Sequence, residues 1–237
     1  MPGKDFRALL FDVFGTVVDW RSSIIHELEA VGAHFGIDAD WVAFADAWRG
    51  LYQPSMEQVR SGQRPWCKLD DLHHESLVTL LERFGVHGLT GAQVDDLNRA
   101  WHRLDPWPDT VAGLNRLRRK YILATLSNGN VALLVNMARH ANLPWDAVLG
   151  AETARCYKPL PESFLRTADH LGLDPEQCVM VAAHNQDLHA AHALGFGTAF
   201  VCRPTEYGPD QQADLEAESD WDFVADSLTE LAAKMGA

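Results

Sequence analysis

The stretch LLFDVFGTVVDW, residues 9–20, decides how this chain is expected to fold. Its apolar run predicts a buried strand, and the run stops at a single carboxylate, Asp12, shortly before a glycine and the hydroxyl of Thr16. Positions i and i+2 of a strand lie on the same side, and the residue two places after Asp12 is Phe14, not a second acid. This lone acid at the end of a buried strand is the first candidate for a reactive group.

Four further apolar runs have the character of buried strands, and they alternate with helical patterns. This rhythm is typical of βαβ units and predicts an α/β fold, with a doubly wound, Rossmann-like parallel sheet as its core. The five expected strands cover residues 8–15, 121–129, 147–152, 178–184 and 198–204.

The long segment between the first two expected strands has no strand pattern and contains amphipathic helical stretches instead. We therefore expect a helical cap inserted after the first strand, with Pro106 and Pro108 marking the return to the core. The expected domains are an α/β core over residues 1–18 and 107–237 and a helical cap over residues 19–106.

The composition is ordinary for a soluble globular protein, with 237 residues of which 47% are hydrophobic and 22% charged. A net charge of −13 argues against nucleic acid as a partner, because no basic stripe is available to neutralise phosphates. It also means that an anionic substrate needs a local cationic pocket. The acidic stretch over residues 214–222 is expected to be solvated surface.

The apolar runs and the cysteines bear on the compartment. No apolar run approaches the length of a membrane span, and the N-terminal MPGKDFRALL lacks the apolar region of a signal peptide. The cysteines show no CxxC spacing, so neither a disulfide framework nor a zinc site is expected. We expect a cytoplasmic protein that has no contact with membranes. The four cysteines are Cys67, Cys156, Cys178 and Cys202.

Polar residues gather where the expected strands end. In an open parallel sheet, ligands bind beyond the carboxyl ends of the strands, so several polar residues that converge on this edge predict a site. Besides Asp12, these residues are Ser127, Asn128, Lys158, His184, Asn185 and Asp187.

The motifs around these residues resemble, in type and order, those of the haloacid dehalogenase superfamily and its L-2-haloacid (type II) dehalogenase branch, including relatives that act on haloacetates. The resemblance covers nearly the whole chain. It implies a hydrolytic dehalogenase that converts short 2-haloalkanoates or haloacetate to the 2-hydroxy acid and halide without a metal or other cofactor. By analogy it also implies a homodimer. The motifs are FDVFGT with Asp12 and Thr16, LSNGN with Ser127 and Asn128, YKPLPESF with Lys158, and AAHNQDL with Asp187.

The resemblance implies a role for each catalytic residue. Asp12 would attack the halogen-bearing carbon and form an ester intermediate. Lys158 would keep Asp12 ionised through its nearby charge, and Thr16 would support the same carboxylate with a hydrogen bond. Asp187 would orient Lys158 and position the water that opens the ester.

The resemblance also implies a binding side. Ser127, Asn128 and the backbone amides that follow them would bind the substrate carboxylate, and Asn128 would contact the leaving halide. Arg49 matches the cap arginine that receives the halide and helps to bind the substrate anion. Phe14 and Trp20 are the aromatic residues expected near the substrate.

Each residue also has a purely structural interpretation. Asp12 could form a turn, and Lys158 could be an exposed loop lysine. Ser127 or Asn128 could cap a helix, and Arg49 could lie on a helix surface.

The sequence departs from the family pattern at several positions. Phe164 stands where many members have a tyrosine, and Ala182 or Ala183 stands where a serine is expected. His184 replaces the expected asparagine, and Asn185 could recover that amide one position later. His184 could bind the hydrolytic water, narrow the halide pocket, or be purely structural.

The same scaffold supports phosphatases, which carry an acid two residues after the nucleophile and bind magnesium partly through an aspartate early in the fourth motif. Phe14 and either Ala182 or Ala183 occupy these positions, although magnesium requires oxygen ligands. Halide departure needs neither a proton donor nor a metal. Dehalogenation is therefore the preferred hypothesis, a divergent small-molecule phosphatase is the alternative, and a non-enzymatic binder of small carboxylates is the third.

Overall fold

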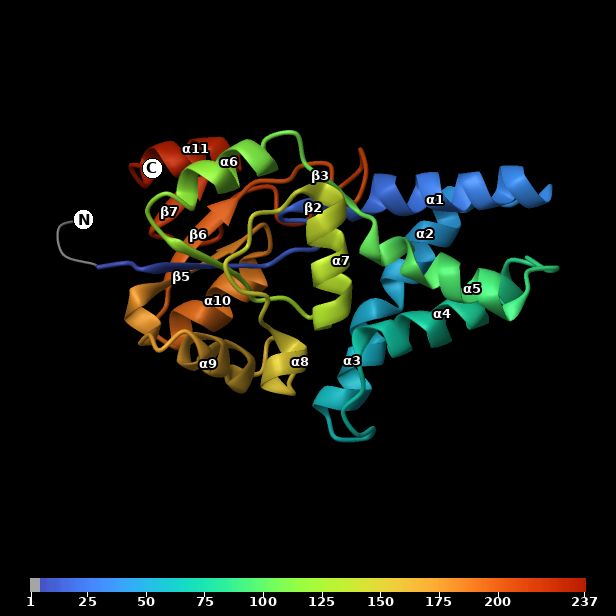
Figure 1. The fold of residues 1–237 in the computed structure, drawn as a ribbon, viewed down its shortest axis with the longest axis horizontal. Helices are drawn as coiled ribbons and strands as arrows, with labels where there is room; N and C mark the ends of the chain where they lie inside the picture. Colours follow the sequence, from blue (N-terminus) through green and yellow to red (C-terminus); the bar gives the residue numbers. More distant parts are fainter. Residues whose placement is uncertain (1–4) are drawn as a thin grey trace.

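The core of the protein is a five-stranded parallel sheet with the strand order β4-β1-β5-β6-β7 (Figure 1). The structure is a computed structural model that describes residues 5–237. The first strand of the chain lies in the interior of the sheet, with β4 and β5 on either side, as a doubly wound fold requires. The strands are β1 (Ala8–Phe11), β4 (Ile122–Thr125), β5 (Cys178–Ala182), β6 (Gly197–Val201) and β7 (Phe223–Ala225).

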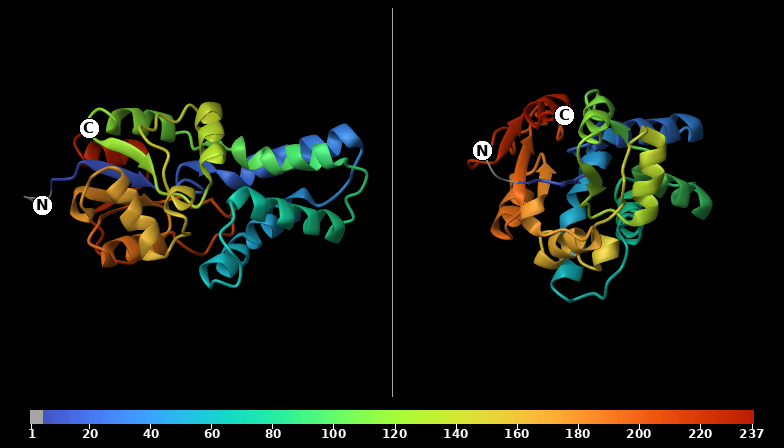
Figure 2. Two further views of the ribbon diagram at one scale, coloured as in Figure 1. Left: turned by 60° about the horizontal axis from the view of Figure 1, so that its bottom comes forward. Right: turned by 60° about the vertical axis from the view of Figure 1, so that its left-hand side comes forward.

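Alternate residues of β1 pack on opposite faces of the sheet. Leu9 and Phe11 belong to the apolar cluster formed with α6, α7 and α11, whereas Ala8 and Leu10 belong to the cluster formed with α9 and α10. Both faces are thus covered, which confirms the predicted α/β class (Figure 2). The helices are α6 (Thr110–Leu117), α7 (Val131–Ala141), α9 (Pro161–His170), α10 (Asn185–Ala193) and α11 (Leu228–Lys234), with the short α8 (Ala151–Ala154) and η2 (Pro175–Gln177) between them.

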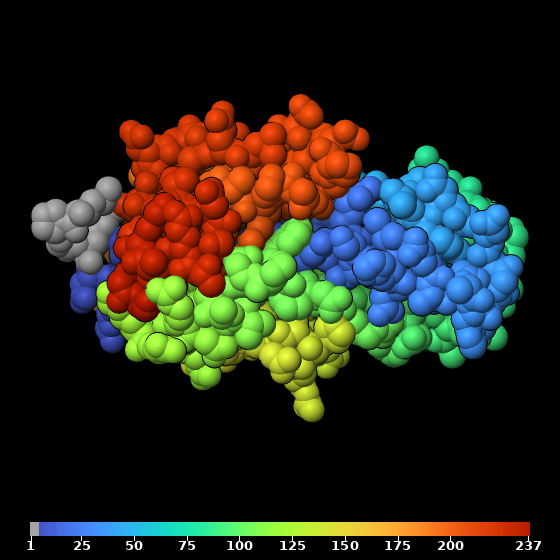
Figure 3. Space-filling view, turned by 90° about the horizontal axis from the view of Figure 1, so that it is seen from above, coloured from blue at the N-terminus to red at the C-terminus, as the bar shows by residue number. Residues whose placement is uncertain are grey.

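A separate lobe of helices follows β1 in the chain and forms one end of the molecule, drawn in blue to green in Figure 3. The chain enters this cap through β2 (Val18–Asp19) and leaves it through β3 (Asp105–Pro106), which pair antiparallel. Asp19 also caps the first cap helix, since its side chain accepts a hydrogen bond from the Ser22 amide. The cap consists of α1 (Trp20–Phe35), α2 (Trp41–Gly50), α3 (Tyr52–Arg60), α4 (Leu69–Arg83), α5 (Gly91–Asn98) and η1 (Arg99–His102).

Polar contacts join the cap to the core beside the sheet edge. Arg60 of α3 donates a hydrogen bond to the backbone oxygen of Lys158 at 2.8 Å. Asp70 of α4 and Asn130, just before α7, exchange two hydrogen bonds. Among residues 5–237, no helix has the length and apolar character needed to cross a membrane.

Two sequence predictions about the sheet are wrong. Residues 147–152 form two isolated bridges instead of a strand, because the Thr125 hydroxyl bonds both backbone groups of Leu149 and interrupts the ladder. The fifth strand is β7, which the sequence did not reveal because it is short and partly exposed. The acidic stretch 214–222 is mainly surface, as expected, but its Trp221 is buried.

Candidate active site

Asp12 follows β1 directly and is held by donors on both carboxylate oxygens. Its backbone amide donates to Val181 of β5, which fixes the chain at the sheet edge. Oδ1 accepts a hydrogen bond from Lys158 Nζ at 2.8 Å, and Oδ2 accepts one from Thr16 Oγ1 at 2.8 Å. The residue is only 6% exposed. The structure therefore places Asp12, Thr16 and Lys158 together, as the sequence predicted.

Lys158 lies between two carboxylates. Its ammonium also donates to Asp187, which occupies the first turn of α10. The backbone amide of Lys158 donates to Asn128 Oδ1 at 2.8 Å, so the loop after β4 orients the lysine. At 3% exposure, this ammonium is buried with its partners, which rules out the interpretation as an exposed loop lysine.

His184 lies between Asp12 and an acid that the sequence did not single out, Glu206. Nδ1 of the imidazole is 3.2 Å from Asp12 Oδ2, and Nε2 is 2.9 Å from Glu206 Oε2. Glu206 Oε1 in turn accepts a hydrogen bond from Trp20 Nε1 at 3.0 Å. His184 therefore belongs to the charged cluster around Asp12.

These contacts set the protonation states. Burial alone would raise the pKa of Asp12, but Lys158 and the hydrogen bond from His184 outweigh it and hold that pKa well below its usual range. Burial would lower the pKa of His184, but Glu206 and Asp12 raise it well above its ordinary value. Burial, only partly offset by Lys158, raises the pKa of Asp187. These shifts favour an ionised Asp12, a protonated His184 and, in Asp187, the more basic of the two carboxylates.

A cavity of about 250 Å³ opens in front of Asp12 and is closed from the cap side by Arg49, Tyr52 and Gln53. Arg49 stacks on the Tyr52 ring at 4.3 Å, and its Nη1 is buried without a hydrogen-bond partner among residues 5–237. The cavity is lined by Asp12, Phe14, Arg49, Tyr52, Gln53, Asn128, Lys158, His184, Gln186, Asp187, Tyr207 and Asp214.

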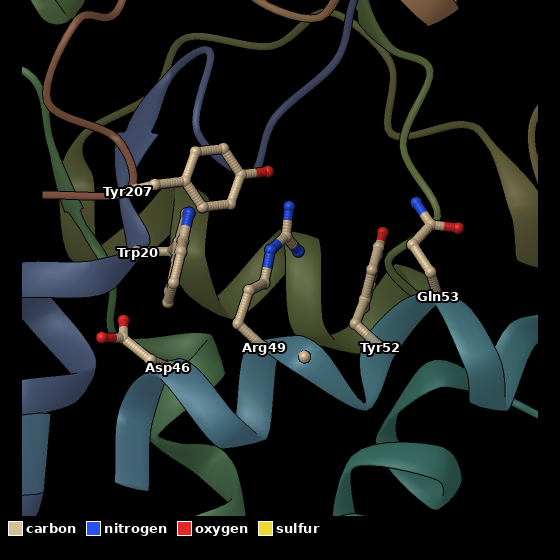
Figure 4. A pocket seen from close by; sticks show the side chains of 7 residues that line it. Trp20, Asp46, Arg49, Tyr52, Gln53 and Tyr207 are labelled. Atoms are coloured by element: carbon tan, nitrogen blue, oxygen red, sulfur yellow. The ribbon is translucent and has the colours of Figure 1, made fainter. Parts of the chain in front are cut away.

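A second cavity of about 350 Å³ adjoins the first and shares Arg49, Tyr52 and Tyr207 with it. In Figure 4 the Arg49 guanidinium points between Tyr207 on one side and Tyr52 on the other. Trp20 lines this second cavity and not the one in front of Asp12. Its contacts with the site run through Glu206 and Arg49.

Four predicted site residues do not line the cavity in front of Asp12: Thr16, which supports Asp12, Trp20, which lines the second cavity, and two others, Asn185 and Ser127. Asn185, the first residue of α10, binds Asp214 and accepts from Trp221 Nε1, so its amide holds the loop after β6. The prediction that Asn185 recovers the family's amide is wrong, because the chain is already turning into the helix there. Ser127 is fully buried, and its Oγ accepts a hydrogen bond from the Gly129 amide, which shapes the loop that presents Asn128.

Tyr52, Glu206 and Tyr207 are among the residues at the site that the sequence analysis did not select. Tyr52 lies three positions after Arg49, close enough in register for both to line the cavity, and this spacing could have indicated it. Glu206 and Tyr207 belong to the loop after β6, and no motif marks them. Their position after a predicted strand is the only available signal.

A metal ion does not fit this arrangement. Asp12, His184 and Asp187 bring ligand atoms within 4.8 Å of one another. However, Lys158 binds an oxygen of each carboxylate, and the charged imidazole faces Asp12, so two cations of the chain already neutralise the acids. Magnesium would need oxygen ligands in their place.

A buried carboxylate bound to a lysine at the carboxyl edge of a doubly wound sheet, beside a helical cap, indicates the class of protein. Residues 6–195 match the model of the haloacid dehalogenase-like hydrolases, and the chain belongs to this family. This confirms the superfamily that the sequence motifs indicated.

Particular relatives narrow the comparison. The chain is 48% identical to a defluorinating L-2-haloacid dehalogenase of known crystal structure, with a TM-score of 0.96 over 98% of this chain and 96% of the other. It is 49% identical to a second L-2-haloacid dehalogenase, with a TM-score of 0.95 over 98% and 99%. It is 29% identical to (S)-2-haloacid dehalogenase 4A of Burkholderia cepacia over 95% of this chain and 98% of the relative. Phosphatases that match over most of the chain do so at lower identity.

Proposed function

We propose that this protein is a metal-independent hydrolytic dehalogenase that converts short 2-haloalkanoates or haloacetate to the 2-hydroxy acid and halide. The observation that carries the proposal is the state of Asp12, a buried carboxylate kept ionised by Lys158 and His184 with Phe14 where a phosphatase needs an acid. The most similar relatives named above are dehalogenases, which supports the same reaction.

The first half of the reaction is a displacement at the halogen-bearing carbon. A carboxylate oxygen of Asp12 forms a bond to this carbon, and the carbon–halogen bond breaks with its electron pair leaving on the halide. Arg49 presents a buried N–H group without a partner among the described residues, so it can bind the substrate anion or the departing halide. Asn128 lines the same cavity and is the second group proposed to contact the halide. The displacement inverts a chiral centre.

The second half hydrolyses the Asp12 ester. Water adds to the Asp12 carbonyl carbon, and Asp187 is the proposed base because its pKa is raised and it lines the cavity. Lys158 stays charged between the two acids and keeps Asp187 in place. The 2-hydroxy acid leaves, the Asp12 carboxylate is restored, and one proton is released.

The test is halide release from chloroacetate, fluoroacetate and racemic 2-chloropropionate with EDTA present throughout. We expect release by the wild type and a loss of about 10⁴-fold or more in Asp12→Asn, as for removal of other covalent nucleophiles. A single turnover in labelled water should place the label in the Asp12 carboxylate. Magnesium-dependent release of phosphate from small esters, with no halide release, would instead establish the phosphatase alternative.

We also propose a cytoplasmic homodimer. Four free cysteines are consistent with a reducing compartment, and the pairing of chains is carried over by analogy with the family. Light scattering of the purified protein measures the oligomeric state directly.

A further inference from the structure

Glu206 is a buried acid outside all four motifs, and the structure makes room for it. It is 1% exposed and reaches the site from the loop after β6. Gly15 has a φ of 86°, and a Cβ atom at this position would collide with the Glu206 carboxylate. A buried carboxylate costs free energy unless it is paired, so its partners indicate its purpose.

Glu206 contacts Nε1 of Trp20 at 3.0 Å, the Arg49 guanidinium at 3.8 Å and Nε2 of His184 at 2.9 Å, and the last of these contacts leads to one oxygen of Asp12. Glu206 binds Nε2 of His184, which leaves Nδ1 facing Asp12 Oδ2 at 3.2 Å. The same oxygen accepts from Thr16 Oγ1, and this hydroxyl is itself fixed by the Ala183 amide at 2.8 Å. Among residues 5–237, Oδ2 therefore faces two donors, Thr16 and His184, whereas Oδ1 has Lys158 alone.

The difference in donors between Oδ1 and Oδ2 affects the reaction once Asp12 has formed the ester. If Oδ1 takes up the substrate carbon, Oδ2 becomes the carbonyl oxygen of the ester and gains negative charge when water adds. Donors fixed in advance at such an oxygen stabilise the transition state, and a charged donor does so most strongly. During ester formation the same donors draw electron density from the attacking carboxylate and give no help.

We propose that Glu206 is a positioning residue that holds the His184 imidazole against Asp12 Oδ2 and thereby accelerates hydrolysis of the ester rather than its formation. The inference rests on the proposed dehalogenase function. His184 and Thr16 together form the oxyanion-binding site of the second half-reaction.

The step balances without any added reactant. Water oxygen bonds to the Asp12 carbonyl carbon, its proton passes to Asp187, and the carbonyl electron pair moves onto Oδ2. When this pair returns, the bond from carbon to Oδ1 breaks, and the departing alkoxide takes the proton of the new carboxyl group. Asp187 then releases its proton to solvent, and His184 keeps its own throughout.

The deciding experiment is pre-steady-state halide release from chloroacetate by Glu206→Gln. We expect a halide burst equal to the enzyme concentration at nearly the wild-type rate, followed by a steady state about 10- to 100-fold slower. Intact-mass spectrometry during turnover should show carboxymethylated enzyme accumulating in Glu206→Gln. Glu206→Asp should restore part of the steady-state rate. Glu230→Gln, on α11, is the matched control and should behave as the wild type.

A purely structural role for Glu206 gives a different result. It lowers the burst and the steady state together, without accumulated ester, and this outcome overturns the inference, as does an unchanged steady state. If Glu206→Gln does not fold, His184→Gln decides the question in the same assay, since it removes the charge at Oδ2 directly. If the wild type releases no halide, the proposed function has failed, not the role of Glu206 within it.

Discussion

The two walls of the cavity in front of Asp12 are built on opposite principles. On the core wall, Asp12, Lys158 and Asp187 bind one another through short contacts at the carboxyl edge of the sheet. On the cap wall, Arg49 stacks on Tyr52 and Trp20 and lies 3.8 Å from Glu206, and its Nη1 has no hydrogen-bond partner among the described residues. The core wall is complete without substrate, whereas the cap wall has an unfilled donor that an anion can complete.

This contrast separates chemistry from recognition. Charges that must be ready before the substrate arrives lie on the sheet edge, where the backbone fixes them. The donor that senses the substrate lies on α2, in a lobe joined to the core by a two-strand connection and side-chain contacts. Substitutions on the core wall should therefore damage both stability and catalysis, and substitutions on the cap wall mainly binding.

Lys158→Met should have the largest effect. It leaves Asp12 and Asp187 buried together without their cation, so we expect a loss of about 3–5 kcal/mol in the free energy of unfolding. Halide release should fall by about 10³-fold or more. Urea denaturation and the halide assay measure the two effects. Lys68→Met, which removes a half-exposed lysine paired with Glu152, is the control and should cost less than about 1 kcal/mol. Full stability in Lys158→Met would contradict the description of the core wall.

Arg49→Lys should affect binding and spare stability. A lysine keeps the charge but loses the planar donors and the stacking on Tyr52. We expect KM for chloroacetate to rise by about tenfold and the free energy of unfolding to change by less than about 1 kcal/mol. Arg99→Lys, on the exposed side of η1, is the matched control. An unchanged KM would mean that the cap wall does not bind the substrate anion.

The dependence of the unfolding free energy on pH tests whether His184 is charged in the folded protein. Asp12 and Glu206 contact the imidazole, and Lys158 and Asp187 are the other charged groups nearby. A pKa raised by folding stabilises the protein below the unfolded value of 6.5, and this contribution is lost as pH rises through the folded value. The gap in unfolding free energy between wild type and His184→Gln should therefore be widest below about pH 6.5 and should narrow as the pH rises above this value. Urea denaturation on both sides of this pH tests it, and a widening gap would show that the imidazole is neutral in the folded protein.

Asn185→Ala should have the smallest effect on catalysis. The Asn185 amide serves the loop after β6, so its loss leaves buried partners unsatisfied and should cost about 1–3 kcal/mol of stability. At a temperature well below the melting transition, halide release should stay close to that of the wild type. Gln212→Ala, in the same loop but exposed, is the control. A severe loss of halide release in fully folded Asn185→Ala would show that Asn185 takes part in catalysis after all.

The sequence predicted the parts of the site that depend on the sheet alone. Carboxyl ends of parallel strands meet at one edge, so Asp12 and Asp187 could be brought together from their order in the chain, and Lys158 joins them after a segment that bridges to β4 without forming a strand. The orientation of Asn185 could not be predicted, because it depends on where α10 begins. The position of Glu206 could not be predicted either, because it lies in the loop after β6, and the sequence of this loop has no periodic pattern that indicates its path.

The connection between cap and core has a consequence for how this protein can change over evolutionary time. Val18 pairs with Pro106 and Asp19 with Asp105, so the cap enters and leaves the core at neighbouring points, about 5 Å apart. Because its two ends lie close together, the whole cap is inserted into the core as a single long loop would be. Lengthening such a loop costs little entropy. Insertions or deletions in the cap therefore need not disturb the register of β1, and substrate preference can diverge while the nucleophile stays where it is.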